Sequence, residues 1–273
     1  MRRVILLLLL VALLSFGACG NSDTAQSSQV GISGFLSPED AVIAYLEGLR
    51  DTNLEAMMSA FAVEAYVAHF DLQTLLERLG VYQAHFVLLP NANELVREMN
   101  VEMRRSHVTS SIRMQYLVLT HPDRHTYASV GSELDNMRIE EDEVAPFLQD
   151  FYVNLNAATW NTLEIQGFIS LEWSEWYREV SERYYEALER RIALLGAEQM
   201  VGRIAVFSLD GDYYLLFADL AEYDGRWYIN EFGGIAGNFL ANVPGAMQGI
   251  MAVGPAEGDA FFDEISAYLI TEW

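Results

Sequence analysis

Three runs of apolar, aromatic and β-branched residues follow one another closely, separated by two Asp-Gly pairs. The runs are Arg203–Leu209, Tyr213–Tyr223 and Arg226–Phe232, and the pairs are Asp210-Gly211 and Asp224-Gly225. Asp-Gly between such runs is a strong hairpin signal, because the tight turn needs positive φ angles that glycine adopts freely. The pattern predicts three consecutive antiparallel strands.

The middle run has apolar residues on both faces of the predicted strand. Tyr214 and Leu216 belong to one face, and Leu215 and Phe217 to the other. A strand without a wet face must be covered on both sides. We expect helices to cover one side. The other side needs further helix, the C-terminal segment or a second subunit, so a homodimer through the sheet is one of the alternatives.

Much of the remaining chain shows the spacing of amphipathic helices. Ser37-Pro38 begins the first, because serine caps the first turn and proline suits the first helical position. Gly196 suits the C-terminal cap of the longest. Further helices are expected over Leu54–Phe61, Asp71–Leu79, Glu94–Arg104, Pro146–Ala157, Trp173–Leu195 and Asp259–Ile270.

The period changes after Glu94–Arg104. Over Val108–Leu119, two sets of residues alternate with a period of two, and the stretch ends at His121-Pro122-Asp123. Such alternation is typical of a strand, so we expect a strand here.

The first residues combine three features of an export signal. A basic start at Arg2 and Arg3 precedes the apolar run Val4–Leu14, which is shorter than the ~20 residues that a membrane-spanning helix needs. Small residues then lead directly to Cys19, the single cysteine. The stretch resembles the lipobox of bacterial lipoproteins, which implies cleavage after Ala18 and a diacylglycerol on Cys19. An ordinary signal peptide is the alternative.

The next segment, residues 20–34, is small and polar and cannot bury enough surface to order itself. We therefore expect a signal peptide over 1–18, a lipidated cysteine and tether over 19–36, and one folded domain over 37–273. The lipobox resemblance implies a bacterial cell-envelope protein. Its place would be the outer side of the cytoplasmic membrane, or the outer membrane.

The net charge of the chain limits the classes of partner that it can bind. The chain has 39 acidic and 16 basic residues and a formal net charge of −23. Such a surface repels phosphate backbones and anionic headgroups, so we expect no nucleic acid and no membrane contact except through the lipid on Cys19. One cysteine allows neither an intrachain disulfide nor a thiolate metal cluster.

Two segments, Ser37–Phe61 and Met200–Phe232, resemble the NTF2-like superfamily, in particular its bacterial lipoprotein members of unknown function. The first reads SPEDAVIAYLEGLRDTNLEAMMSAF, and the second contains YDGRWYINEF. The resemblance implies an α+β fold, a cystatin-like cone in which a curved antiparallel sheet packs on N-terminal helices around a cavity. The long middle of the chain then implies a helical insertion over about 121–196, followed by a C-terminal helical tail over 259–270.

Candidate chemistry centres on Asp219, which lies mid-strand among apolar neighbours. A general base needs a perturbed pKa in a dry pocket, and Asp219 is the best candidate for one. Tyr116, Tyr214 and Trp227 would line the same cavity. The simpler interpretation has Asp219 facing solvent at a strand edge or pairing with an arginine. We assign no catalytic residue.

Metal and cofactor signals are weak. His121, Asp123 and His125 offer possible ligands, but they surround a proline in a turn and are best interpreted as a solvated loop. Asp210 and Asp212 flank a hairpin glycine and lack the other ligands of a calcium loop. We expect no metal and no cofactor.

The sequence therefore favours a lipid-anchored, extracytoplasmic binding or interaction protein of unknown ligand, without catalytic activity. The alternative is a small-molecule carrier, or an NTF2-like enzyme acting on an apolar ligand in the cone. A third interpretation is a structural envelope protein that self-associates through the sheet.

Overall fold

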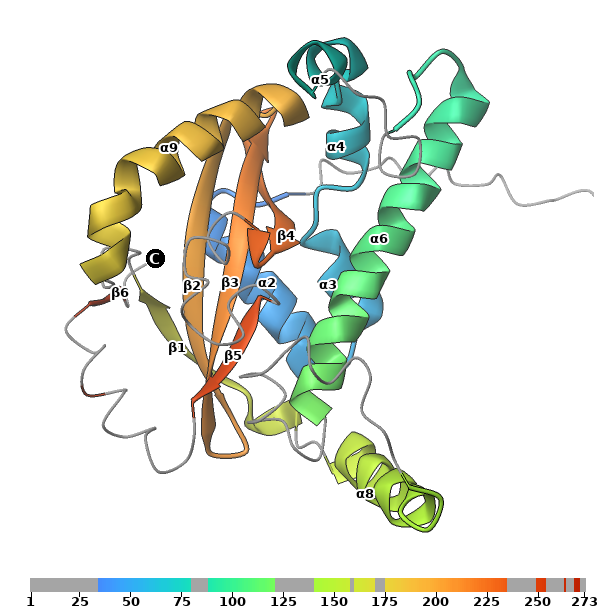
Figure 1. The fold of residues 1–273 in the computed structure, drawn as a ribbon, viewed down its shortest axis with the longest axis vertical. Coiled ribbons are helices and arrows are strands. Elements are labelled where there is room, and N and C mark those ends of the chain that lie inside the picture. Colours follow the sequence, from blue (N-terminus) through green and yellow to red (C-terminus); the bar gives the residue numbers. More distant parts are fainter. Residues whose placement is uncertain are drawn as a thin grey trace, which may run out of the picture. The chain divides into compact units, whose positions relative to one another are not determined.

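The predicted meander is the centre of the sheet (Figure 1). In the computed structural model, β2 (Gln199–Leu209), β3 (Asp212–Tyr223) and β4 (Arg226–Phe232) pair antiparallel in sequence order. The φ angles are 57° and 86° at Asp210 and Gly211, and 52° and 68° at Asp224 and Gly225. Both Asp-Gly turns are thus confirmed. The structure describes residues 34–79, 88–120, 140–157, 160–169, 175–234, 249–253, 263 and 268–270.

Three shorter strands join the sheet within the described residues. They are β1 (Glu164–Ile169), β5 (Ile250–Val253) and β6 (Leu269–Ile270). The strand order is β4-β3-β2-β1-β6, and β5 pairs with the part of β3 that β4 leaves open. These strands pair antiparallel with one another, and outside them Phe61 forms an isolated parallel bridge with Ile229 of β4. The fold class is α+β, with a curved antiparallel sheet packed on helices, as predicted.

The helices begin and end close to the predicted positions in most cases. Ser37 caps the first helix by accepting a hydrogen bond of 3.0 Å from the amide of Asp40. The helices are α2 (Pro38–Arg50), α3 (Leu54–Ser59), α4 (Glu64–His69), α5 (Leu72–Leu79), α6 (Glu94–Thr120), α8 (Val144–Ala157) and α9 (Glu175–Leu195), with a 3₁₀ turn, η2, at Trp160–Thr162.

The strand predicted over Val108–Leu119 is wrong, because this stretch continues the helix that starts at Glu94. Apolar residues occur in both alternating sets, so the period of two did not separate buried positions from exposed ones. The buried positions step by three or four: Arg104, Val108, Ile112, Gln115, Val118 and Leu119. No glycine or proline interrupts the chain between Pro90 and Pro122, so the helix runs on.

Two further predictions need correction. The range 121–196 was expected to be a helical insertion, yet Glu164–Ile169 is a strand that pairs with β2. The C-terminal tail was expected to be helical up to Ile270, yet Leu269 and Ile270 pair with Ile169 and Phe168 of β1. In both places, apolar residues satisfy their backbone hydrogen bonds at the open edge of the sheet rather than within a helix.

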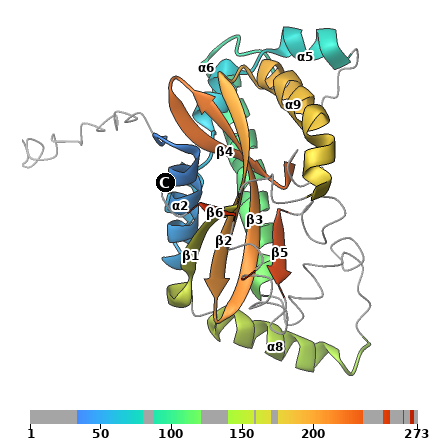
Figure 2. The same cartoon turned by 90° about the vertical axis from the view of Figure 1, so that its left-hand side faces the viewer.

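Both faces of β3 are covered by this chain's own residues. Tyr214, Leu216, Ala218 and Leu220 join the core formed with α2, α3 and α6. Leu215, Phe217 and Ala221 join a second core that includes Leu188 and Leu195 of α9. Figure 2 shows α2 and α9 on opposite sides of the sheet. The expectation that β3 is covered on both faces is confirmed, and the homodimer stays a prediction.

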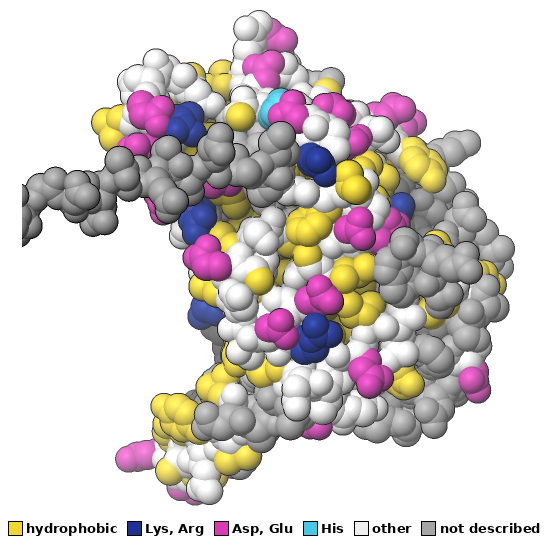
Figure 3. Space-filling view, turned by 180° about the vertical axis from the view of Figure 1, so that it is seen from behind, with side chains coloured by type: hydrophobic (Ala, Val, Ile, Leu, Met, Phe, Trp, Pro, Cys, Tyr) yellow, Lys and Arg dark blue, Asp and Glu magenta, His cyan; other side chains and the backbone are white. Residues whose placement is uncertain are grey.

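On the face seen in Figure 3, acidic side chains are dispersed rather than gathered in one patch. Figure 3 shows them scattered over one face, with few basic side chains among them. Among the described residues, no helix is both long enough and apolar enough to cross a membrane. The residues from 34 onward cluster as one compact unit.

Candidate functional site

The three aromatic residues predicted to line a cavity are packing residues of one core. Tyr116 stacks on Trp160 with ring centroids 4.9 Å apart. Tyr214 is fully buried and stacks on Phe207 at 5.3 Å. Trp227 is mostly buried at the start of β4, where its backbone pairs with that of Phe35. None of the three lines either of the pockets described below.

Asp219 lies on the other side of the sheet and is fully buried. It sits between β2 and β4, so the expectation that it faces solvent at a strand edge is wrong. Glu231 is directly opposite on β4. A Cβ atom on Gly234 would collide with both carboxylates, so the backbone passes directly over this acidic pair. Asp219 itself lines neither pocket.

A cleft of about 370 Å³ opens beside that acidic pair, and we call it the arginine cleft. Its walls come from α4, α6, α9 and β4, together with the segment before α6. A volume of this size is typical of small-molecule sites. The lining residues are Tyr66, Leu88, Met103, Arg104, His107, Arg191, Leu195, Asn230 and Glu231.

The floor of the arginine cleft is set by a bulge in β4. The register of β4 against β3 shifts by one residue, so Asn230 has no partner on β3. Arg104 of α6 donates hydrogen bonds to Asn230 in place of a partner on β3. Its Nη2 donates to the carbonyl of Asn230 at 2.6 Å and to the side-chain Oδ1 at 3.3 Å, and its Nε donates to the carbonyl of Ala62 at 3.3 Å.

Arg104 is buried, with 8% of its surface exposed, and its guanidinium lies 4.3 Å from the ring centroid of Tyr66. Burial lowers the pKa of Arg104, but a guanidinium stays charged at neutral pH. Burial also raises the pKa of Tyr66, against the opposing charges of Arg104 and Arg191. The stack therefore joins a neutral ring to a cation, which is the attractive arrangement.

The second arginine closes one side of the arginine cleft. Arg191 of α9 forms an ion pair with Glu231 of β4, and both side chains are partly exposed. This pair joins α9 to the sheet beside the arginine cleft. A half-exposed ion pair of this kind is worth about 1 kcal/mol or less, so its geometry matters more than its strength.

An asparagine network holds the apolar wall formed by Leu88. Asn100 of α6 accepts from the amide of Leu89 at 3.0 Å and donates to its carbonyl at 2.7 Å. It also donates to Asn91, which donates in turn to the carbonyl of Val67 on α4. These bonds tie the segment before α6 to two helices, so Leu88 stays buried in the wall.

His107 stands at the mouth of the arginine cleft, one turn after Arg104 on α6. Burial and then the positive charge of Arg104 lower the pKa of His107. The imidazole is therefore largely neutral at pH 7.

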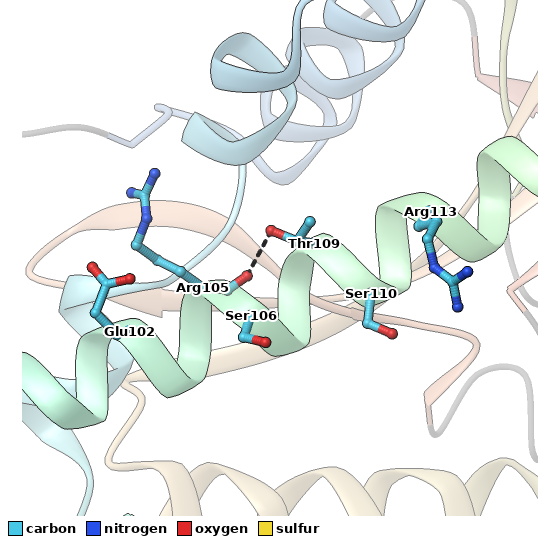
Figure 4. A pocket seen from close by; sticks show the side chains of 6 residues that line it. All are labelled: Glu102, Arg105, Ser106, Thr109, Ser110 and Arg113. Atoms are coloured by element: carbon cyan, nitrogen blue, oxygen red, sulfur yellow. Dashed lines mark hydrogen bonds between the residues drawn. The ribbon is translucent and has the colours of Figure 1, made fainter.

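A second hollow, of about 410 Å³, is open and less well defined (Figure 4). The six side chains that line it all come from α6, from Glu102 to Arg113. Arg105 lies 3.6 Å from Glu55, and Thr109 donates to a carbonyl of its own helix. The described residues provide no opposing wall, so we favour the arginine cleft as the candidate site.

Other candidates from the sequence lie outside the described residues. These are Cys19 and the stretch with His121, Asp123 and His125. Within the described residues, no group of three or more histidine, cysteine or acidic side chains is arranged to hold a metal ion.

Comparison with known proteins adds little about function. No family model matches the chain, and no curated protein matches it. A cystatin-like protein from Ruminococcus gnavus ATCC 29149, solved as a crystal structure, is similar in fold with a TM-score of 0.41 and 13% sequence identity. The match covers 80% of this chain and 44% of that one, so this chain spans less than half of that protein's length.

The sequence analysis missed the residues that form the arginine cleft. One signal was available. Arg104 is four residues before Val108 and eight before Ile112, so it lies on the same stripe of α6 as two buried apolar residues. A charged residue inside an apolar helical stripe indicates a buried, hydrogen-bonded cation. That stripe was hidden by the strand prediction.

Proposed function

We propose that this protein is a lipid-anchored, extracytoplasmic binding protein that holds a small molecule in the arginine cleft. The observation that carries the proposal is the arginine cleft itself, which combines a suitable volume, apolar walls and converging polar groups from four elements. The anchor is supported by the N-terminal stretch that ends at Cys19.

The chemistry of the lining favours binding over catalysis. Guanidinium groups stay protonated near neutral pH, so neither arginine can act as an acid or a base. The carboxylate of Glu231 is occupied by its ion pair with Arg191. The other proton carriers in the lining are His107, which is exposed, and Tyr66, whose pKa burial raises further above neutral pH.

The binding part of the proposal is tested with a pair of matched variants. Met103 lines the arginine cleft, whereas Met99, one turn earlier on α6 and similarly exposed, does not. Met103→Trp should fill the arginine cleft, and Met99→Trp should leave it open. Full-length protein purified in detergent from its own membranes is melted before and after exhaustive dialysis.

A bound ligand stabilises the folded state by mass action. Dialysis should therefore lower the melting temperature of the wild type and of Met99→Trp, and leave that of Met103→Trp unchanged. A wild-type melting temperature that dialysis does not alter would contradict the proposal.

The anchor is tested by fractionation. Cys19→Ser should move the protein from the membrane fraction to the soluble fraction, because the thiol that carries the lipid is removed. Retention of the variant in membranes would refute the lipid anchor without bearing on the arginine cleft.

A further inference from the structure

The charges that line the arginine cleft do not balance. The lining contains two guanidinium groups and one carboxylate, and the carboxylate of Glu231 is already paired with Arg191. Among the described residues, Arg104 has no carboxylate as a hydrogen-bond partner: its hydrogen bonds go to two carbonyl groups and one amide oxygen. A buried cation without a counter-ion is costly, and an anion placed beside it removes part of that cost.

Arg104 also has donors to spare. A guanidinium carries five N–H groups. The Nε group and the two N–H groups of Nη2 serve Ala62 and Asn230. The two N–H groups of Nη1 have no hydrogen-bond partner within the part of the chain that the structure describes, and Arg104 lines the arginine cleft. Arg191 adds donors beyond the one that meets Glu231.

The lining also contains apolar side chains, which would suit the body of an organic molecule rather than a bare ion. Leu88 and Leu195 are buried in the walls, and Met103 is partly exposed at the edge. The ring of Tyr66 adds an aromatic surface beside the guanidinium of Arg104. A dianion is disfavoured, because Glu231 stands close to the spare donors and only one positive charge is in excess.

We propose that the arginine cleft binds a small organic monoanion, a carboxylate on an apolar body, whose carboxylate meets Nη1 of Arg104 and whose body packs on Leu88, Met103 and Leu195. The proposal rests on the proposed function and adds the class of ligand. The two N–H groups of Nη1 diverge, so one N–H of Nη1 would meet one carboxylate oxygen and a donor of Arg191 the other.

The test uses three probes that share one body: 4-phenylbutyrate, 4-phenylbutanamide and 4-phenylbutylammonium. Each is titrated calorimetrically into full-length protein in detergent, and a titration into micelles alone is subtracted. A charge-assisted hydrogen bond is about twice as strong as a neutral one, so the carboxylate should bind about tenfold more tightly than the amide. The ammonium probe should bind more weakly than both.

A variant that binds the carboxylate probe more tightly cannot owe that effect to structural damage, because damage to the fold would weaken binding. Glu231→Gln removes the competing negative charge and frees Arg191, so it should tighten the binding of 4-phenylbutyrate about threefold or more and leave the amide unchanged. Glu189→Gln, an exposed position of α9 outside the lining, is the matched control and should alter neither.

The outcomes separate the two proposals. Equal binding of carboxylate and amide, or tighter binding of ammonium, would overturn the inference about charge and leave the binding function standing. A carboxylate preference that Glu231→Gln weakens would also overturn it. If none of the three probes binds and the wild-type melting temperature is unaltered by dialysis, both the ligand class and the binding function are refuted.

Discussion

Replacing Arg104 with methionine tests whether the guanidinium holds the floor of the arginine cleft. The change keeps an unbranched, apolar side chain on α6 but leaves the carbonyls of Ala62 and Asn230 without their donor. Each buried acceptor left unsatisfied costs about 1–3 kcal/mol. Loss of the stack on Tyr66 adds about 0.5–2 kcal/mol. Relief from burying a charge offsets part of this sum, and the expected loss is about 2–4 kcal/mol.

The matched control is the neighbouring residue. Arg105 is partly exposed and lies 3.6 Å from Glu55, whose side chain is 80% exposed. Arg105→Met removes the same charge and should alter stability by about 0.5 kcal/mol or less. Arg104→Lys keeps the charge but cannot reach both carbonyls with a planar fork, so its loss should lie between those of the other two.

The assay is urea unfolding of the full-length protein in detergent, followed by circular dichroism and tryptophan fluorescence. The difference in free energy of unfolding is taken from transition midpoints at a common slope. Equal stability of Arg104→Met and Arg105→Met would refute the reasoning, because it would mean that the two carbonyls find other partners or water.

Three further predictions concern the surroundings of the arginine cleft. Asn100→Ala removes the bonds that tie the preceding segment to α6 and should cost about 1–3 kcal/mol in urea unfolding. Gly196→Ala should lower the free energy of unfolding more than Gly225→Ala, because a Cβ at Gly196 would collide with a carbonyl at the end of α4. A Cβ at Gly225 meets nothing, so Gly225→Ala carries only the cost of its positive φ, about 1 kcal/mol. For His107, whose pKa is lower in the folded state than its ordinary value of about 6.5, the unfolded chain takes up the proton first as pH falls. Stability should therefore decrease as pH is lowered through about 6.5, and the decrease in melting temperature should be smaller in His107→Gln.

The parts of the fold that sequence patterns predicted are those fixed by local rules. Each Asp-Gly turn depends on the φ preferences of two residues, and the cap at Ser37 depends on one side chain and one amide. The two faces of β3 follow from alternation along a single strand. None of these features requires knowledge of distant residues.

The strand predicted at Val108–Leu119 shows that local rules alone do not determine every element. Its alternating pattern has apolar residues in both sets, so the period alone could not distinguish a strand from a helix with buried residues at spacings of three and four. The packing partners decided the matter, because α6 lies against α3, α4 and β4, which are far from it in the sequence.

Local sequence patterns could not predict the arginine cleft either, because residues that are far apart in the sequence form it. Tyr66 and Glu231 lie in its lining although most of the folded chain separates them in sequence. The bulge at Asn230 is produced by a register shift between two strands, and no residue type marks it. Sequence patterns singled out Asp219, but its acidic neighbour Glu231 and its place beside the arginine cleft, outside the lining, appear only in three dimensions.

The most direct test of the binding function is native mass spectrometry of the full-length protein, released gently from detergent after purification from its own membranes. The account predicts a small molecule that accompanies the wild type and Met99→Trp and is missing from Met103→Trp. A wild type that carries no such molecule, or a molecule retained equally by Met103→Trp, would contradict the claim that the arginine cleft is a ligand site.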